Sequence, residues 1–182
     1  MSRKDDPPEE IVWEGRFIAA KRRGKWEYVS RTRGVHAAVI LAIDAGHVLL
    51  VEQYRMPLGA WCLELPAGLV GDEQEGEEMA AAAIRELEEE TGYRAARMID
   101  LGCFHASPGM SSEGFNLLRA EGLARVGDGG GVAGEDIIVH RAPLDRVAAL
   151  VASKRAQGCA IDAKLLLLLS SYLLGDGADQ AR

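Results

Sequence analysis

Several glutamates between residues 77 and 91 recur at a spacing that suits a metal ion. If this segment is a helix, Glu86, Glu89 and Glu90 project from neighbouring positions, because they lie three and four residues apart. Carboxylates that close repel one another unless a cation lies between them. Such oxygen ligands are those that Mg²⁺ prefers, often together with substrate phosphates. Arg85 can pair with Glu89, which leaves Glu86 and Glu90 to face a metal ion.

A glutamate-rich helix face is, by itself, more often only solvated. Here a longer pattern surrounds the glutamates, because the segment fits G-x5-E-x7-R-E-U-x-E-E-x-G-U, where U is a bulky apolar residue. Its fixed positions are Gly71, Glu77, Arg85, Glu86, Leu87, Glu89, Glu90, Gly92 and Tyr93. This pattern is the Nudix box, and the chain resembles the Nudix hydrolases, which cleave nucleoside diphosphates linked to another moiety. The resemblance implies Mg²⁺ as cofactor, with Mn²⁺ as the alternative, held by Glu86 and Glu90 with help from Glu89.

The first glycine of the box can be placed in two ways. Gly71 fits the spacing directly. In many relatives this glycine belongs to a Pro-Ala-Gly sequence, which here ends at Gly68, so an insertion before the helix is the alternative. We favour Gly68, because the sequence from Glu64 to Gly68 resembles the end of a strand in the family. The resemblance then assigns a metal-binding backbone carbonyl to Ala67 rather than to Val70.

Residues outside the box resemble the ADP-ribose pyrophosphatase branch of the family and the neighbouring GDP-mannose and sugar-nucleotide hydrolases. Pro108 lies about where these relatives carry a proline, although a simple Pro-Gly turn also explains it. The runs around Trp13 and Trp26 resemble extra strands whose tryptophans stack on adenine, with ordinary sheet packing as the alternative. Arg31, in the second run, is expected to contact substrate. Arg55 matches an arginine that reaches substrate, and a surface ion pair is its alternative.

Two glutamates are candidates for the general base that takes a proton from the attacking water. Glu135 directly follows the glycine-rich segment 127–134, which resembles a glutamate-bearing loop of the family and is expected to be mobile. Glu113 follows the Ser-Pro-Gly turn, where relatives also place a glutamate. Either carboxylate could instead be merely solvated.

The resemblance also implies an activity and an assembly. The expected reaction is Mg²⁺-dependent hydrolysis of the diphosphate of ADP-ribose or another ADP-sugar, which gives AMP and ribose 5-phosphate from ADP-ribose. A hydrolase of GDP-mannose or of nucleoside diphosphate sugars in general is the first alternative, and a non-catalytic ADP-ribose sensor is the second. The complete set of box carboxylates argues against the sensor. Relatives of this branch are usually homodimers whose N-terminal strands contribute to the partner's site, so a homodimer is expected.

Strand-like and helix-like runs follow one another in an order that predicts a mixed sheet between helices. The fold class is α/β (α+β), which agrees with the Nudix fold carrying an N-terminal antiparallel β extension. Strands are expected at 16–21, 25–31, 35–44, 47–54, 97–106, 115–124 and 136–141, and helices at 77–91, 143–154 and 162–174. We expect Gly92 to end the first helix, and the last helix to be buried on much of its surface. The expected segments are a disordered tail at 1–10, a β extension for dimerisation and substrate contact at 11–34, the Nudix hydrolase domain at 35–174 and a disordered tail at 175–182.

Composition limits the partners that this chain can have. The 182 residues include 21 Lys and Arg against 28 Asp and Glu, which gives a formal net charge of −7. This balance disfavours a nucleic-acid partner, but not a small anion that binds together with a divalent cation. No apolar run is long enough to span a membrane, no secretory signal is visible, and the three cysteines form no close pair. We therefore expect a cytoplasmic protein that binds a nucleoside diphosphate sugar, and neither nucleic acid nor membrane.

Overall fold

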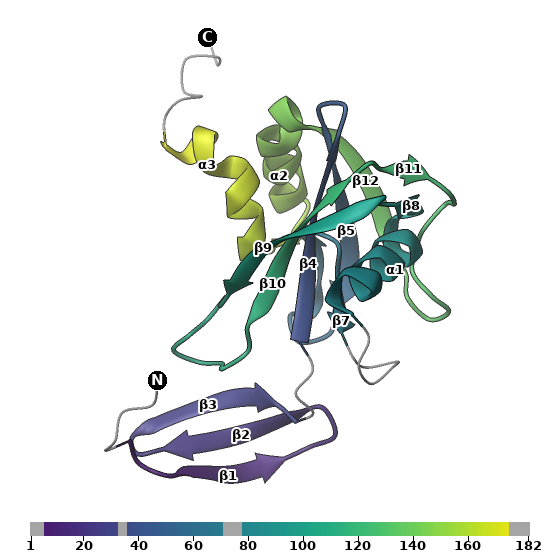
Figure 1. The fold of residues 1–182 in the computed structure, drawn as a ribbon. Helices are drawn as coiled ribbons and strands as arrows, with labels where there is room; N and C mark the ends of the chain where they lie inside the picture. The colour runs from purple at the N-terminus through teal and green to yellow at the C-terminus, as the bar shows by residue number, and fades with distance from the viewer. Residues whose placement is uncertain (1–5, 33–35, 71–77, 175–182) are drawn as a thin grey trace.

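The computed structural model describes residues 6–32, 36–70 and 78–174, and Figure 1 shows their arrangement. Gly71 and Glu77 of the box and the segment 175–182 lie outside the described residues. The strands are β1 (Glu9–Glu14), β2 (Ile18–Arg23), β3 (Trp26–Arg31), β4 (His36–Asp44), β5 (His47–Arg55), β6 (Ala60–Glu64), β7 (Ala67–Val70), β8 (Tyr93–Arg94), β9 (Arg97–Phe104), β10 (Phe115–Glu121), β11 (Ala124–Arg125), β12 (Ile138–Pro143) and β13 (Ala160–Ile161). The helices are α1 (Met79–Thr91), α2 (Val147–Ala156) and α3 (Leu166–Leu174), with 3₁₀ turns η1 (Leu144–Arg146) and η2 (Ala163–Leu165).

β4 lies at the centre of the main sheet. The strand order is β13-β6-β5-β4-β10-β9, and β7 and β12 pair with β4 and β5 outside this path. β4 runs parallel to β10 and antiparallel to β7, so the sheet is mixed, as predicted. β4 and β5 pair only beside their turn, at Ile43↔Val48 and Asp44↔His47. Beyond the turn the two strands separate, which lets β4 pair with β7 and β5 pair with β6.

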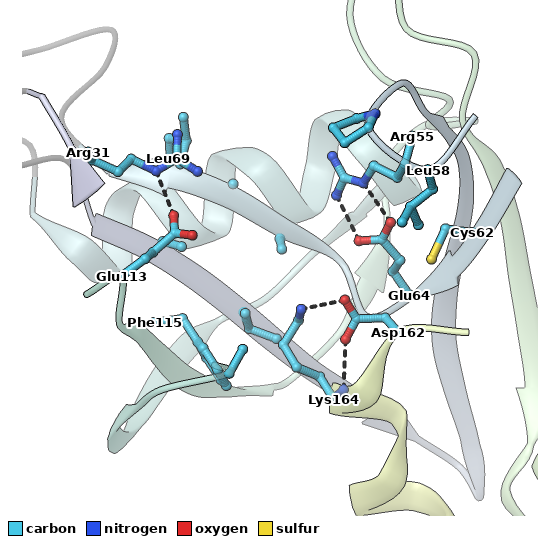
Figure 2. Close-up of a pocket in the computed structure, with 16 residues that line it drawn as sticks. Arg31, Arg55, Leu58, Cys62, Glu64, Leu69, Glu113, Phe115, Asp162 and Lys164 are labelled. Atoms are coloured by element: carbon cyan, nitrogen blue, oxygen red, sulfur yellow. Dashed lines mark hydrogen bonds and ion pairs between the residues drawn. The ribbon is translucent and has the colours of Figure 1, made fainter. Parts of the chain in front are cut away.

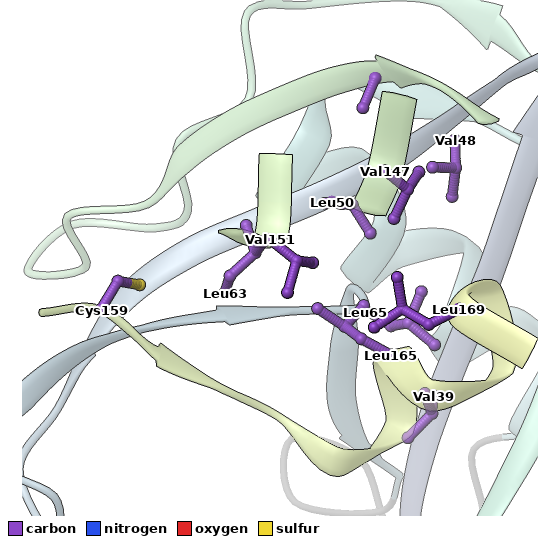
Figure 3. Packing of buried hydrophobic residues seen from close by; sticks show 11 residues of the cluster. Val39, Val48, Leu50, Leu63, Leu65, Val147, Val151, Cys159, Leu165 and Leu169 are labelled. Carbon is purple, nitrogen blue, oxygen red and sulfur yellow. The ribbon is translucent and has the colours of Figure 1, made fainter. Parts of the chain in front are cut away.

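Helices cover both faces of this sheet (Figure 1). Successive side chains of a strand point to opposite faces, so β4 contributes to two apolar clusters. Ala38 and Ile40 pack with Ala83 and Leu87 of α1 on one face, whereas Val39 packs on the other. Figure 3 shows this second cluster, to which the C-terminal part of the chain contributes Val147, Val151, Leu165 and Leu169. The predicted sandwich of a mixed sheet between helices is therefore confirmed.

The C-terminal end of α1 is closed by tightly packed glycines. Gly92 ends the helix, as predicted, in the left-handed conformation with φ 73°. A Cβ atom on Gly92 would lie 2.4 Å from the carbonyl oxygen of Gly127, and one on Gly129 would lie 2.4 Å from the carbonyl carbon of Thr91. Only glycine allows the backbone of the segment 127–134 to approach α1 so closely.

Backbone hydrogen bonds attach this glycine-rich segment to the helix. The N–H of Gly130 donates to the carbonyl of Glu90 at 2.9 Å, and the N–H of Gly131 donates to that of Glu89 at 3.0 Å. These bonds use carbonyls that a helix end leaves without an intrahelical partner. The segment that we expected to be mobile is therefore fixed, in this structure, against the helix that carries the box glutamates.

The N-terminal extension is a separate antiparallel sheet, β1-β2-β3, that lies beside the main fold (Figure 1). The hairpin predicted at 16–21 and 25–31 is present as β2 and β3. Residues 1–10 were expected to be a disordered tail, but β1 begins at Glu9. Glu9 instead pairs with Lys21 of β2 at 2.7 Å, and Glu10 pairs with Arg22 at 2.8 Å. Cross-strand pairs of opposite charge stabilise a strand without burying it, and hydrophobicity patterns do not detect them.

The last helix corrects a second expectation. The segment that forms α3 is apolar on all sides, so we expected it to be buried on much of its surface. Within η2 and α3, however, only Leu165 and Leu169 are buried, whereas Leu167, Tyr172 and Leu174 are exposed. The helix packs on the sheet along one side only. No helix within the described residues is long and apolar enough to cross a membrane.

Candidate active site

The site forms where β7 meets α1. The N–H of Ala67, the first residue of β7, donates to Oε2 of Glu90 at 3.1 Å. Next to it, a Cβ atom on Gly68 would lie 2.1 Å from both Cγ and Cδ of Glu86, so glycine is required for the helix side chain to lie against this strand. The N–H of Ile40 in β4 donates to the carbonyl of Pro66 at 2.8 Å and fixes the strand from the other side.

Burial makes Glu90 an unusual acid. Its side chain is only 5% exposed. The pKa of Glu90 is raised from its usual 4.5 to about 8, mainly by the loss of water on burial. The negative charges of Glu86 and Glu135 contribute to this rise, whereas the Ala67 N–H and Arg55 oppose it. A buried carboxylate among like charges is stable only when it binds a proton or a cation.

Arg85 partly balances these charges. Its Nη1 lies 3.1 Å from Oε2 of Glu89, which is the pair that the helical spacing predicts, and also 3.1 Å from Oε1 of Glu86. Glu86 is therefore shared between Arg85 and the acidic site, whereas Glu90 faces inward. The guanidinium can thus hold both Glu86 and Glu89 in position beside the buried carboxylate.

The residues present fit a divalent cation that takes few protein ligands. Within the described parts of the chain, no three His, Cys, Asp or Glu side chains gather closely enough to form a complete metal cage. Mg²⁺ usually binds only one or two carboxylates and completes its shell with water and substrate phosphates. Glu86 and Glu90 can supply those carboxylates, and the raised pKa of Glu90 indicates a strong need for positive charge.

Glu135 reaches the site through the glycine-rich segment. The backbone N–H of Val132 donates to Oε2 of Glu135 at 3.2 Å, and the N–H of Glu135 donates to the carbonyl of Val132 at 3.0 Å. A Cβ atom on Gly131 would lie 2.7 Å from Oε2 of Glu135, so a larger residue there would displace the carboxylate. Because this segment is attached to α1, the charge of Glu135 is close enough to raise the pKa of Glu90.

A cavity of about 570 Å³ is lined in part by Ala67 and Gly68, and Figure 2 shows its larger side chains. Its charged lining residues form ion pairs, which are Arg31–Glu113 at 2.6 Å, Arg55–Glu64 at 2.6 Å and Lys164–Asp162 at 2.6 Å. Because every lining cation has its own carboxylate, these side chains together give the cavity no positive charge. A diphosphate would therefore need a further cation to bind here.

The sequence-predicted residues divide into three groups. The first lies at or beside the junction of β7 and α1 and does not line the cavity: Arg85, Glu86, Glu89, Glu90 and the exposed Glu135. Arg31, Arg55, Glu113 and Ala67 line the cavity. Trp13, Trp26 and Pro108 do not. Trp13 and Trp26 lie in the N-terminal sheet, where they are 57% and 58% exposed, and Pro108 lies in an exposed turn.

The lining also includes residues that the sequence did not assign to the site, among them Glu64, Phe115, Asp162 and Lys164. Asp162 carried a recognisable signal, because Asp is a preferred residue at the start of a helix, and its side chain does accept from the N–H of Lys164. Nothing in the sequence indicates that Glu64 pairs with Arg55. Cys62 also lines the cavity, but burial and the charge of Glu64 raise its pKa to about 12, so its thiol is not an ionised nucleophile.

Comparison with known proteins finds a family model that matches part of the chain and a solved structure with a similar fold. Residues 32–114 match the family model described as NUDIX domain. The chain is 40% identical over 87 residues to an ADP-ribose pyrophosphatase of Bacillus subtilis (strain 168), which covers 48% of this chain and 45% of that protein. It is 39% identical over 104 residues to an ADP-sugar pyrophosphatase of Mus musculus, covering 47% and 46%. The chain spans about half the length of these curated relatives.

A solved structure resembles the whole described fold. The crystal structure of an ADP compounds hydrolase matches with a TM-score of 0.69 over 94% of this chain and 95% of that one. Its sequence is 24% identical to this chain, so the likeness concerns the fold.

The burial of Glu90 predicts how the stability of the metal-free protein depends on pH. The folded chain keeps the proton of Glu90 up to about pH 8, whereas the unfolded chain releases it near 4.5. The folded state therefore binds more protons between these values, so the free energy of unfolding decreases as pH rises through this window. Glu90→Gln removes the titration and should raise the free energy of unfolding above the window by roughly 5 kcal/mol.

Urea unfolding in EDTA, from about pH 5 to about pH 9, measures this difference. Glu88→Gln is the matched control, because Glu88 lies on the same helix but pairs with Arg94 at 2.7 Å near the surface. We expect the control to keep the pH dependence of the wild type. A wild-type profile as flat as that of Glu90→Gln would contradict the assignment.

Proposed function

Residues 32–114 are a NUDIX domain, and from this premise we propose that the protein hydrolyses the diphosphate of ADP-ribose or a related ADP-sugar, to AMP and ribose 5-phosphate in the case of ADP-ribose. The observation that carries the proposal is the buried carboxylate of Glu90 on Ala67, beside a cavity large enough for a nucleotide sugar. Similarity to an ADP-ribose pyrophosphatase and an ADP-sugar pyrophosphatase supports the substrate class.

We propose Mg²⁺ as the cofactor, held by Glu86 and Glu90 with Glu89 and the Ala67 carbonyl as further ligands. Nudix hydrolases generally use divalent metal ions. A bound Mg²⁺ would supply the positive charge that the cavity lacks and would activate the attacking water. In this account Arg85 positions Glu86 and Glu89, because its guanidinium contacts both carboxylates.

Glu135 is the general base that we favour over Glu113. The carboxylate of Glu113 is already engaged by Arg31, from which it accepts a charge-assisted hydrogen bond at 2.6 Å. Glu135 has no such cationic partner among the contacts described, and its charge acts on Glu90. A carboxylate close to the metal ligands is well placed to accept a proton from the attacking water.

Substrate contacts are assigned to both ends of the cavity. The guanidinium of Arg55 forms a bidentate pair with Glu64 at 2.6 and 2.7 Å. It still presents further N–H groups, and these can bind phosphate. Arg31 lies where the main fold meets the N-terminal sheet, and a base could stack nearby. Pro108 would shape the turn that precedes Glu113.

We propose that the protein is a homodimer through its N-terminal sheet. This sheet exposes apolar and aromatic side chains that a monomer would leave in water, namely Ile11, Val12, Trp13, Phe17, Ile18 and Trp26. A second copy could bury these residues and bring Trp13 and Trp26 to the partner's cavity. We also propose that the protein is cytoplasmic.

The first test measures product formation from ADP-ribose, ADP-glucose and GDP-mannose with Mg²⁺ and with EDTA. We expect turnover of ADP-ribose to AMP that EDTA abolishes. Glu90→Gln should lower kcat by roughly 100-fold or more, because it removes an anionic ligand with little change in volume.

Glu88→Gln is again the control and should keep wild-type turnover. Preference for GDP-mannose would overturn the substrate while keeping the metal chemistry. Tight ADP-ribose binding without turnover of any compound would make the domain a sensor. Full activity of Glu90→Gln with an unchanged Mg²⁺ requirement would contradict the metal assignment.

A second test separates the two candidate bases. Glu135→Gln should lower kcat by about 100-fold to 10,000-fold and leave Mg²⁺ binding unchanged, because it removes proton transfer but not a ligand. Glu113→Gln should mainly raise KM through the loss of its contact with Arg31. Steady-state kinetics of both variants, with Mg²⁺ affinity from calorimetry, give the comparison. If only Glu113→Gln lowers kcat, the choice of Glu135 is wrong.

A further inference from the structure

One ion pair of the cavity has no role in the chemistry proposed above. Asp162 and Lys164 stand at the start of η2, on the wall of the cavity formed by the C-terminal part of the chain (Figure 2). Oδ2 of Asp162 accepts from Nζ of Lys164 at 2.6 Å. Both side chains are only 20% exposed, so the pair lies within the cavity rather than at its rim.

The backbone holds this pair rigidly. The N–H of Asp162 donates to the carbonyl of Leu63 in β6 at 3.0 Å. Oδ1 of Asp162 accepts from the N–H of Lys164 at 2.7 Å, which starts the helical turn. Leu165, the next residue, is fully buried in the apolar core. The pair therefore stands on the core and needs no ligand to order it.

Helix capping accounts for Asp162 but not for the position of the Lys164 amine. A lysine at a helix start normally extends its amine into water. Here Nζ of Lys164 instead lies 5.7 Å from the centre of the Phe115 ring, on the wall of the same cavity. The side chain is largely shielded from water, and among the described residues the amine contacts Asp162 and the Phe115 ring.

The chemistry of the pair favours a neutral, hydroxyl-bearing group. The ammonium of Lys164 has three N–H donors, and the carboxylate of Asp162 keeps lone pairs beyond the bonds that it already accepts. A sugar hydroxyl both donates and accepts, so it can bind between them. The opposite charges of the pair cancel, which makes a phosphate a poor ligand. Phe115 adds an apolar ring face for the C–H groups of a sugar.

The pair lines the same cavity as the residues beside the metal carboxylates. Ala67 and Gly68 form part of the cavity lining next to the metal carboxylates, and Asp162 and Lys164 line the same cavity. Arg31 and Glu113 occupy a different part of it, next to the N-terminal sheet (Figure 2). A diphosphate beside Ala67 can therefore extend one substituent toward Arg31 and the other toward Lys164.

We propose that Asp162, Lys164 and Phe115 form the subsite for the uncharged, hydroxyl-bearing group that the diphosphate links to the nucleoside. The inference rests on the proposed function, because it assumes a nucleoside diphosphate ligand beside Ala67. These three side chains would distinguish a sugar from a substituent without hydroxyl groups.

The test compares two ligands in calorimetry with Ca²⁺, a cation of looser coordination geometry than Mg²⁺. One ligand is ADP-ribose, and the other is the methyl ester of ADP, which keeps the adenosine and the diphosphate but has no second sugar. Lys164→Met should weaken ADP-ribose binding by about tenfold and methyl-ester binding by less than about twofold. Asp162→Asn, which keeps an acceptor at the helix start, should give the same selective loss.

Lys154→Met is the matched control. Lys154 also forms a 2.6 Å pair with a carboxylate, that of Glu52, and is similarly shielded at 17% exposure, but it does not line this cavity. This variant should bind both ligands as the wild type does. Equal losses for both ligands in Lys164→Met, unchanged ADP-ribose binding in that variant, or no ADP-ribose binding by the wild type would each overturn the subsite.

Hydrolysis is measured in parallel with Mg²⁺, so that the two proposals can fail separately. If wild type binds ADP-ribose, shows the selective loss in Lys164→Met and hydrolyses nothing, the proposed function fails and the subsite stands. If wild type hydrolyses ADP-ribose and the selective loss is missing, the subsite fails and the function stands.

Discussion

A carboxylate with almost no access to water stands at the junction of β7 and α1, and the surrounding structure is arranged around it. Glu90 can approach the Ala67 N–H because Gly68 leaves room for the neighbouring helix side chain. The helix ends directly afterwards at Gly92, and the glycine-rich segment closes over its last carbonyls. Burial that would destabilise a charged group is tolerable when a proton or a cation neutralises it. The geometry of the site therefore couples the fold to the binding of positive charge.

The charged side chains of the cavity next to this carboxylate likewise leave a need for a cation. Its arginines and its lysine are already paired with carboxylates, so they orient a ligand more than they attract it. Under the proposed function, a diphosphate would bind together with a divalent cation, which the acidic face of α1 can hold. Ion pairs fixed in advance also limit the reorganisation that binding requires. In this account the ion pairs of the cavity orient the ligand, and the carboxylates of α1 hold the cation that neutralises its charge.

The parts that sequence predicted well depend on local patterns, and the parts that it missed depend on distant contacts. The glutamate spacing and the glycine stop of α1 are local, and both are present in the structure. Glu9 joins a strand through charges on the next strand, which a scan for buried faces does not detect. The apolar α3 was expected to be buried, but no described element covers its outer side. Lys164 enters the cavity only because β13 and η2 pack against β6, a contact between segments far apart in the chain.

The central claim is that a divalent cation takes the place of a proton on Glu90. Counting the protons released when Mg²⁺ binds, by calorimetry in buffers of different ionisation enthalpy, tests it most directly. With a pKa of about 8 for Glu90, wild type at pH 7 should release about one proton for each Mg²⁺ bound at this site. Glu90→Gln should release almost none and bind Mg²⁺ more weakly. Equal proton release and equal affinity in the two proteins would contradict the account.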